Sequence, residues 1–274
     1  MTERGAASRT ASLRVLVKGS SLVLKPPDRQ QEFGEYTFPR HAEDVLRARG
    51  IDATVWNAGV VGELTRSAFD VWEEQVLAWT PDVVVLGYAY YECIHAFVPH
   101  WWERLMNPEL RRPELPRRLV RRMLIEPAFM ATAKIQRLIE KTLWRRTTPV
   151  RRRRVILRYR ALIERTRRAG DPLVLVLDLL GPNERAGDWF PGMAGRIDLM
   201  NTALEQMVAD LGDPDVRIIS VRDLVDPDPT VDPVPDGLHY EPGLRRRIGE
   251  AVAAAALDRV RGLPESARPA VREA

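Results

Sequence analysis

A histidine follows an aspartate by three residues near the carboxyl end of the chain, a spacing that suits a general base and its orienting partner. Asp236 and His239 lie on a Pro- and Gly-rich loop that opens onto an Ala-rich stretch. A carboxylate held against an imidazole fixes the tautomer of the ring and leaves its second nitrogen to accept a proton. A nucleophile must complete such a pair, and Ser21 offers one directly after the first apolar run. Since geometry rather than chain order defines a catalytic triad, these residues predict a Ser-His-Asp triad.

Short aliphatic runs bounded by turn residues predict the strands that must position these groups. The five runs are Leu13–Lys18, Ala53–Trp56, Val83–Gly87, Leu173–Leu177 and Arg217–Ser220. Helical patterns separate them, over Arg40–Arg49, Ser67–Trp79, a long stretch within 115–169, Ile197–Leu211 and Leu244–Val260. Alternating strands and helices predict an α/β fold whose parallel sheet is covered by helices on both faces. In such folds the functional site lies at the carboxyl ends of the strands.

The candidate chemical groups all follow predicted strands. Ser21 follows the first strand, Gly59 the second, and residues 88–92 the third. Asp236 and His239 follow the fifth strand. Because the carboxyl ends of parallel strands share one edge, the sequence predicts that these residues meet there.

Four segments, in this order, resemble the conserved blocks of the SGNH (GDSL-type) hydrolases. Gly19-Ser20-Ser21 is similar to the family's Gly-Asp-Ser, and Asn57-Ala58-Gly59 matches its Asn-x-Gly. The turn after the third strand stands where the family has Gly-x-Asn-Asp, and Asp236 with His239 matches its Asp-x-x-His. The resemblance covers about residues 20–100 and 170–260. It implies a three-layer, flavodoxin-like fold with a five-stranded parallel sheet.

The resemblance also implies roles for individual residues. It makes Ser21 the nucleophile, His239 the general base and Asp236 its orienting partner, acting on an ester through an acyl-enzyme. The backbone N–H groups of Ser21 and Gly59 would form the oxyanion hole, with Tyr91 where the family has an asparagine. Loss of one such donor typically costs about 10²- to 10³-fold in rate. Asn57, Tyr88 and Glu92 are candidates for substrate contact, and Glu92 is equally suited to bracing the loop.

The resemblance leaves the outcome of the acyl-enzyme open. Hydrolases and acyltransferases share every residue up to the step at which water or an alcohol accepts the acyl group. Ser20 and Tyr91 depart from the family pattern, and these departures favour a third reading, a catalytically silent binding module. We expect the substrate to be an ester of a lipid, a glycan or a carrier-bound metabolite.

The composition of the chain limits the kinds of site and the cellular locations that can be expected. The chain of 274 residues has one cysteine, Cys93, which excludes a disulfide framework and a Cys-based zinc site and favours a reducing, cytoplasmic location. The apolar run after residue 12 is short and carries Lys18, so neither a signal peptide nor a membrane span is expected. No cofactor and no metal are implied. His95 and His100 flank an aromatic segment that we expect to form a pocket wall or lid.

The charge of the chain is strongly uneven. Residues 101–170 hold 21 Lys and Arg against 6 Asp and Glu, whereas the whole chain has a net charge of +4. We expect a single domain over 13–263 with a basic helical insertion at about 101–168, and disordered ends at 1–12 and 264–274. The basic segment 117–154 suits an anionic membrane surface at the inner membrane face, an acidic carrier protein, or a lid. Nucleic acid is not favoured, because no binding motif is present.

Overall fold

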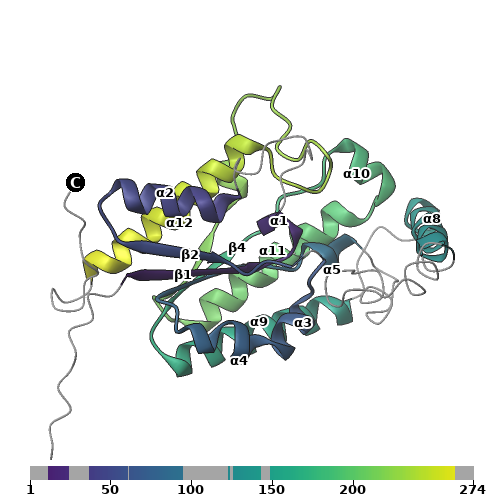
Figure 1. Ribbon diagram of the computed structural model, residues 1–274. Helices are drawn as coiled ribbons and strands as arrows, with labels where there is room; N and C mark the ends of the chain where they lie inside the picture. The colour runs from purple at the N-terminus through teal and green to yellow at the C-terminus, as the bar shows by residue number, and fades with distance from the viewer. Residues whose placement is uncertain are drawn as a thin grey trace, which may run out of the picture.

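The computed structural model describes residues 12–24, 37–60, 62–94, 123, 126–142 and 149–262, and a parallel sheet forms its centre (Figure 1). The strands are β1 (Leu13–Gly19), β2 (Ala53–Asn57), β3 (Val83–Gly87), β4 (Leu173–Leu177) and β5 (Val216–Ile219). They are ordered β2-β1-β3-β4-β5, and every neighbouring pair is parallel. The predicted α/β class and five-stranded sheet are confirmed, and the strand ends differ from the predicted ones by at most one residue.

The burial of the strands explains their sequences. β3 and β4 are buried throughout, and in β1 only Arg14 is partly exposed. A parallel sheet covered on both faces needs such continuous aliphatic runs. β2 lies at one edge and alternates, so Trp56 is 38% exposed and packs edge-on against Trp79, with the ring centroids 5.2 Å apart.

Helices cover both faces of the sheet (Figure 1). On one face α2 (Phe38–Ala48) packs against α12 (Pro242–Gly262). The other face carries α3 (Thr65–Asp70), α4 (Trp72–Gln75), α9 (Pro149–Ala169) and α11 (Met193–Leu211). The expected helix over Ser67–Trp79 is divided into α3, α4 and the 3-10 helix η1 (Leu77–Trp79). The sheet and the helices on its two faces thus form three layers, as in a flavodoxin-like fold.

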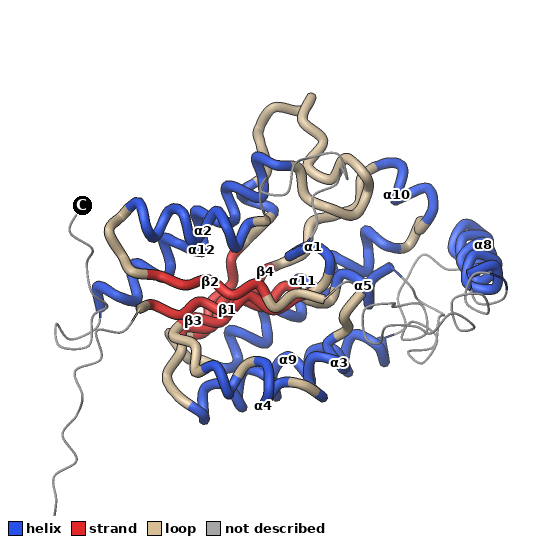
Figure 2. The backbone as a smooth tube through the Cα atoms, in the orientation of Figure 1, coloured by secondary structure: helices blue, strands red, loops and turns tan. Residues whose placement is uncertain are grey.

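Short helices gather where the strands end. α1 (Ser21–Leu24) follows β1, α5 (Tyr90–Ile94) follows β3, and α10 (Glu184–Trp189) follows β4 (Figure 2). After β5 the chain forms the 3-10 helix η3 (Arg222–Leu224) and then a long loop that ends at α12. The candidate residues lie on these connections, so the predicted carboxyl edge is the edge at which the structure assembles them.

The stretch expected to be a basic insertion is partly core. Its final part forms α9, whose Val155, Tyr159 and Leu162 are buried against the sheet. These residues repeat at helical spacing, while Arg153, Arg154 and Arg168 are exposed on its outer side. The expected boundary near residue 168 is therefore corrected, since residues 149–168 belong to a sheet-covering helix.

α8 (Glu126–Thr142) stands apart from the sheet (Figure 1). A buried ion pair fastens it to α11: Arg196 donates to the Glu140 carboxylate, and each side chain is only 1% exposed. Arg196 also donates to the carbonyls of Cys93 and Ile94, at 2.5 and 3.1 Å. Glu140 in turn accepts the Gly192 amide at 3.0 Å. This cluster ties α8, the end of α5 and the start of α11 together.

Replacing Arg196 by methionine is expected to lower the free energy of unfolding by about 3–5 kcal/mol, because Glu140 then stays buried without its cation. Urea denaturation monitored by circular dichroism measures the loss. The double variant Arg196→Met/Glu140→Gln removes the uncompensated charge and should lose less than the single variant. Equal losses in both variants would show that the ion pair contributes nothing beyond side-chain packing.

Several expectations fall on residues that the structure does not describe. These are the ends at 1–11 and 263–274, His95 and His100, and the parts of the expected insertion at 101–122, 124–125 and 143–148. Within the described ranges, no helix combines the length and the apolar character needed to cross a bilayer.

Candidate active site

The Asp236–His239 pair is formed as the spacing predicts. Asp236 Oδ1 accepts the amides of Leu238 and His239 at 2.9 and 2.7 Å, and Oδ2 lies 2.6 Å from His239 Nδ1. Burial tends to raise the pKa of Asp236, but the hydrogen bonds from the His239 side chain and from the two amides outweigh it, so this pKa is lowered. The carboxylate is therefore ionised at neutral pH and holds the Nδ1–H tautomer of His239.

The other ring nitrogen of His239 is enclosed but not bonded. His239 Nε2 is buried and has no hydrogen-bond partner in the part of the chain that the structure describes. Because Nδ1 donates to Asp236, Nε2 carries a lone pair that is free to accept a proton. A buried polar atom without a partner is costly in a folded protein and marks a place where function is to be sought. This nitrogen is suited to act as a general base.

Gly237, between the two residues, allows the loop to reach this geometry. Its φ of +82° is a left-handed conformation that side chains disfavour, and a Cβ there would lie 2.8 Å from the Cβ of Ala186. The loop is fastened to α10 by Asn183, whose Nδ2 donates to the Val234 carbonyl at 2.9 Å. The conformation of the loop thus depends on glycine and on the packing of α10.

Tyr90 links the loop after β5 to the end of β3. Its hydroxyl donates to the Gly237 carbonyl at 3.4 Å, and its side chain is 2% exposed. Burial raises the pKa of Tyr90 well above its usual range, so the hydroxyl keeps its proton. Ala89, just before it, has φ of +80°, a strained conformation of the kind that collects at functional sites. Tyr90 lies in the predicted 88–92 turn but was given no role of its own, because its contact joins residues 147 positions apart.

Ser21 begins α1 directly after β1 and is 8% exposed. Gly19 brings this turn close to β3, since a Cβ at Gly19 would lie 2.6 Å from the Gly87 carbonyl oxygen. The amide of Ser20 donates to the same carbonyl at 3.3 Å, while the buried Ser20 hydroxyl has no hydrogen-bond partner within the described ranges. Ser21 therefore lies at the end of β1 beside the end of β3, the strand whose following turn carries Tyr90.

The structure brings Ser21 and His239 to one edge but forms no hydrogen bond from Ser21 Oγ to His239 Nε2, since Nε2 bonds to none of the described residues. Hydrogen bonds between catalytic groups are often long before a substrate binds and tighten in its complex. The triad is therefore a prediction that the Asp–His half of the geometry supports.

In the Asn57-Ala58-Gly59 turn, the Asn57 side chain binds the amide of Gly59. The Gly59 amide donates to Asn57 Oδ1 at 3.2 Å, and Asn57 Nδ2 donates to the Val23 carbonyl at 3.1 Å. Asn57 thus joins the end of β2 to α1, which carries Ser21. The amide expected in the oxyanion hole has an internal acceptor, and it serves an oxyanion only by releasing Asn57.

Tyr88, a candidate for substrate contact, is completely buried instead. Its hydroxyl donates to Glu63 at 2.8 Å, and Lys18 donates to the same carboxylate at 3.1 Å and to the Ala58 carbonyl at 3.1 Å. Burial raises the pKa of Glu63, and the charge of Lys18 opposes this shift. The expectation for Tyr88 is corrected: its side chain points into a polar network beneath the site, because Tyr88 extends the buried strand β3.

Glu92 is also interior, at 1% exposed, and braces the neighbouring loop. It accepts both the amide and the hydroxyl of Thr65, at 2.8 and 2.9 Å, at the start of α3. Of the two roles left open by the sequence, the structure shows the bracing one. Tyr91 follows Tyr90 in the first turn of α5 and is partly exposed, and its part in an oxyanion hole stays a prediction.

Neither a reactive thiol nor a metal cluster is evident in the described part of the chain. Cys93 is fully buried, and burial raises its pKa to about 12, so the thiol stays protonated and unreactive. No group of three His, Cys, Asp or Glu side chains among the described residues is placed to hold a metal ion.

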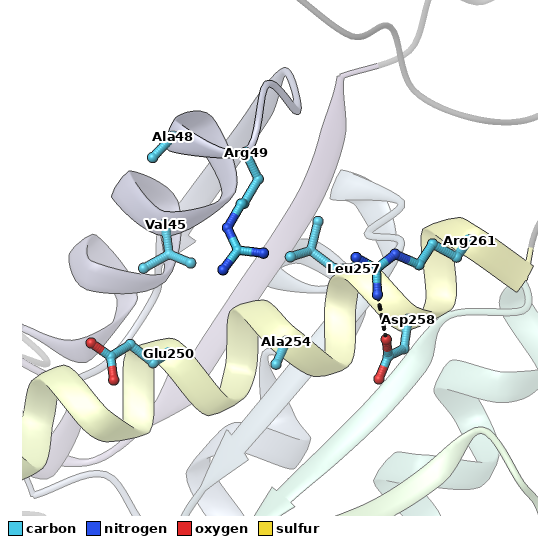
Figure 3. A pocket seen from close by; sticks show the side chains of 8 residues that line it. All are labelled: Val45, Ala48, Arg49, Glu250, Ala254, Leu257, Asp258 and Arg261. Atoms are coloured by element: carbon cyan, nitrogen blue, oxygen red, sulfur yellow. Dashed lines mark hydrogen bonds and ion pairs between the residues drawn. The ribbon is translucent and has the colours of Figure 1, made fainter.

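A surface groove of about 500 Å³ lies elsewhere, between α2 and α12 (Figure 3). Val45 and Leu257 form part of its apolar lining, and the Arg49 side chain points into the gap between the helices. Arg261 is bonded to Asp258 at its far end, at 3.3 Å. The groove contains none of the candidate residues, so the proposed chemistry does not involve it.

Comparison with known proteins agrees with this architecture. An acetylxylan esterase from Geobacillus stearothermophilus matches over 92% of this chain and 95% of its own, with a TM-score of 0.56 and 14% identity. A lipase/acylhydrolase from Enterococcus faecalis matches over 91% and 96%, with a TM-score of 0.53 and 15% identity. A putative GDSL-like lipase from Parabacteroides merdae matches over 89% and 96%, with a TM-score of 0.51 and 14% identity. This chain has the SGNH (GDSL-type) hydrolase fold.

The comparisons are structural, since no family model and no curated protein matches the sequence. Solved catalytic mutants of the acetylxylan esterase replace a serine, an aspartate or a histidine by alanine, and in that enzyme the aspartate precedes the histidine by three residues. The Asp236–His239 pair of this SGNH fold has the same spacing.

Proposed function

We propose that this protein is a serine-dependent ester hydrolase in which Ser21 is the nucleophile, His239 the general base and Asp236 the residue that orients it. One observation carries the proposal: Asp236 holds Nδ1 of His239 at 2.6 Å, while the buried Nε2 has no hydrogen-bond partner among the described residues. The serine, aspartate and histidine of the structurally similar acetylxylan esterase support the same assignment. The single cysteine supports a cytoplasmic setting for this activity.

Acylation begins when His239 Nε2 removes the proton of the Ser21 hydroxyl. The Ser21 oxygen attacks the ester carbonyl, and a tetrahedral oxyanion forms. As it collapses, the ester C–O bond breaks and the imidazolium gives its proton to the departing alcohol. The acyl group is then joined to Ser21, and His239 is neutral again. Asp236 stabilises the imidazolium between these two proton transfers.

Deacylation repeats the sequence with water. His239 removes a proton from water, the hydroxide attacks the acyl-enzyme, and the proton passes to Ser21 as the carboxylic acid leaves. An alcohol in place of water gives acyl transfer on the same residues. Adding an alcohol acceptor and analysing the products separates a hydrolase from an acyltransferase.

The oxyanion needs donors at the start of α1. The Ser21 amide is the first helical N–H and has no acceptor within its own helix, so it is available to the oxyanion. The Gly59 amide and the Tyr91 hydroxyl are the further donors that we propose, although Gly59 now donates to Asn57. Because that amide has an internal acceptor, a catalytically silent binding module is the second candidate function.

A fluorophosphonate probe tests the proposal directly, because an activated serine displaces its fluoride and becomes phosphonylated. Treatment of the purified protein, followed by mass spectrometry, is expected to place one adduct on Ser21. The adduct should be absent from Ser21→Ala and strongly reduced in His239→Ala, and it should persist in Ser20→Ala. A protein that stays unlabelled, or that is labelled equally without His239, would favour the binding module. Screening of lipid, glycan and carrier-bound esters then identifies the substrate.

A further inference from the structure

The helix α8 has its polar and apolar sides reversed. Its side chains that face the protein include Gln136 and Glu140, each only 1% exposed. Its outward side holds Met130, Ile135 and Leu138, which are 47%, 57% and 64% exposed. A surface helix normally turns its apolar stripe to the core and its polar side to water. The outward side of α8 is therefore built for an apolar surrounding that the described part of the chain does not supply.

The polar side of α8 already contacts the rest of the protein. Glu140 pairs with Arg196, and Gln136 donates to the Ile94 carbonyl at 2.9 Å. Asp188 on α10 pairs with both Arg137 and Lys141, and Arg137 also lies 5.1 Å over the Trp189 ring. These contacts fix which way the helix faces. The apolar residues cannot turn inward without breaking a buried ion pair, at considerable cost.

The outward residues form one continuous stripe. Met130, Lys134 and Leu138 are spaced four residues apart, and Ile135 lies beside them, so all share one side of the helix. Lys134 is exposed within this stripe. A lysine among aliphatic residues lays its methylene chain along apolar surface and extends its ammonium group to a polar boundary.

We propose that the outward stripe of α8 (Met130, Lys134, Ile135 and Leu138) binds the surface of an anionic lipid bilayer, with the helix lying along the interface. Charge complementarity supports this occupant. Residues 117–154 hold thirteen Arg and Lys against two Glu, one of which is the buried Glu140. Aliphatic residues on one side with a high cationic charge are typical of helices that lie in the headgroup region of anionic membranes.

The same features disfavour the other occupants. A second copy of the chain would place two segments of the same strong positive charge together, and like charges at an interface repel. A protein partner would be expected to meet Trp or Tyr anchors, and residues 126–142 contain neither. The stripe offers only aliphatic side chains and lysine, which suits a fluid apolar layer better than a shaped protein pocket.

The position of α8 relates this surface to the candidate site without resting on the proposed function. α8 lies beyond the edge at which the strands end (Figure 1). Its partner α10 packs against Gly237, between Asp236 and His239. A bilayer bound to α8 would therefore lie at the side of the molecule that holds the candidate site, a suitable arrangement for access to ligands carried in lipid.

Vesicle flotation with the full-length protein tests the proposal. Binding is expected with mixed phosphatidylcholine and phosphatidylglycerol vesicles and much less with phosphatidylcholine alone, and added salt should weaken it. The variant Ile135→Ser/Leu138→Ser should bind the mixed vesicles at least about tenfold more weakly, since it removes two aliphatic side chains from the interface. Leu199→Ser is the matched control, because Leu199 is 40% exposed on α11, and it should bind like the wild type.

A second variant covers the case in which the double variant fails to fold. Lys134→Glu keeps the polar side of α8 and should lower binding to anionic vesicles alone, with an unchanged thermal midpoint. Absence of vesicle binding by the wild-type protein, or binding that the double variant leaves unchanged, would overturn the proposal. A concentration-dependent dimer that Ile135→Ser/Leu138→Ser abolishes would instead make the stripe a self-interface. Vesicle binding by a protein without esterase activity would contradict the proposed function and leave this inference standing.

Discussion

Replacing Ser21 by alanine is expected to lower kcat for a soluble ester by roughly 10⁴- to 10⁶-fold, because no acyl-enzyme can form without the serine oxygen. A small residual rate should remain, since substrate binding and oxyanion donors still act on water-mediated hydrolysis. Steady-state kinetics with a short-chain chromogenic ester measures the loss, and circular dichroism verifies the fold. Alanine at Ser21 keeps the backbone of α1, so the thermal midpoint should change little.

Ser20 supplies a control one residue away. Its hydroxyl is buried and bonds to none of the residues that the structure describes, so Ser20→Ala removes no hydrogen bond seen there and should keep kcat within a few-fold of the wild type. A large loss in Ser20→Ala with an active Ser21→Ala would show that the nucleophile has been assigned to the wrong serine. Comparable losses in both would indicate damage to the turn between β1 and α1 rather than loss of a nucleophile.

The sheet was predictable from sequence because its signal is local. In β3 and β4 each strand is a short unbroken aliphatic run, and burial on both faces of a parallel sheet requires such a run. The Asp236–His239 contact was predictable for the same reason, since its two residues are three positions apart. Contacts between neighbours in sequence depend on the local backbone, which the turn residues indicate.

The directions of side chains beyond the strand ends were not predictable. Tyr88 and Glu92 both follow β3 in the turn where substrate contact was expected, and both are buried. Which side of a turn faces inward depends on partners distant in sequence, here Glu63 for Tyr88 and Thr65 for Glu92. The environment of a charged residue inside a strand was not predictable either. Lys18 is completely buried, and its hydrogen-bond partners are distant from it in sequence.

The positive charge of the expected insertion was a poor guide to where the insertion ends. Arginine runs suggested an insertion up to residue 168, but in α9 the buried Val155, Tyr159 and Leu162 form the apolar stripe of a core helix. Arginine is compatible with either setting, because its long apolar stem packs along a surface while its charge stays in water. The spacing of the aliphatic residues, rather than the density of charge, distinguishes α9 from α8.

Replacing Asp236 by asparagine is expected to lower kcat by about 10⁴-fold with little effect on the fold. The amide oxygen can still accept the amides of Leu238 and His239, as Asp236 Oδ1 does at 2.9 and 2.7 Å, so the loop keeps its conformation. The amide NH₂ then faces His239 Nδ1 and must donate to it. The ring proton moves to Nε2, which can no longer accept the proton of Ser21.

If Asp236 had only a structural role, its replacement would leave the tautomer of His239 unchanged, so the tautomer tests the orienting role directly. The ¹⁵N chemical shifts of the His239 ring should show Nδ1–H in the wild type and Nε2–H in Asp236→Asn, with kcat falling in parallel. The difference in the free energy of unfolding between the wild type and Asp236→Asn should also depend on pH. The folded pKa of Asp236 lies below its ordinary value of 3.8, so the ionised carboxylate stabilises the wild type above that value, and the advantage is lost as pH falls through the folded pKa. If Asp236→Asn keeps kcat within tenfold and leaves Nδ1 protonated, Asp236 does not orient the base. His239 would then act, if it acts at all, through another partner.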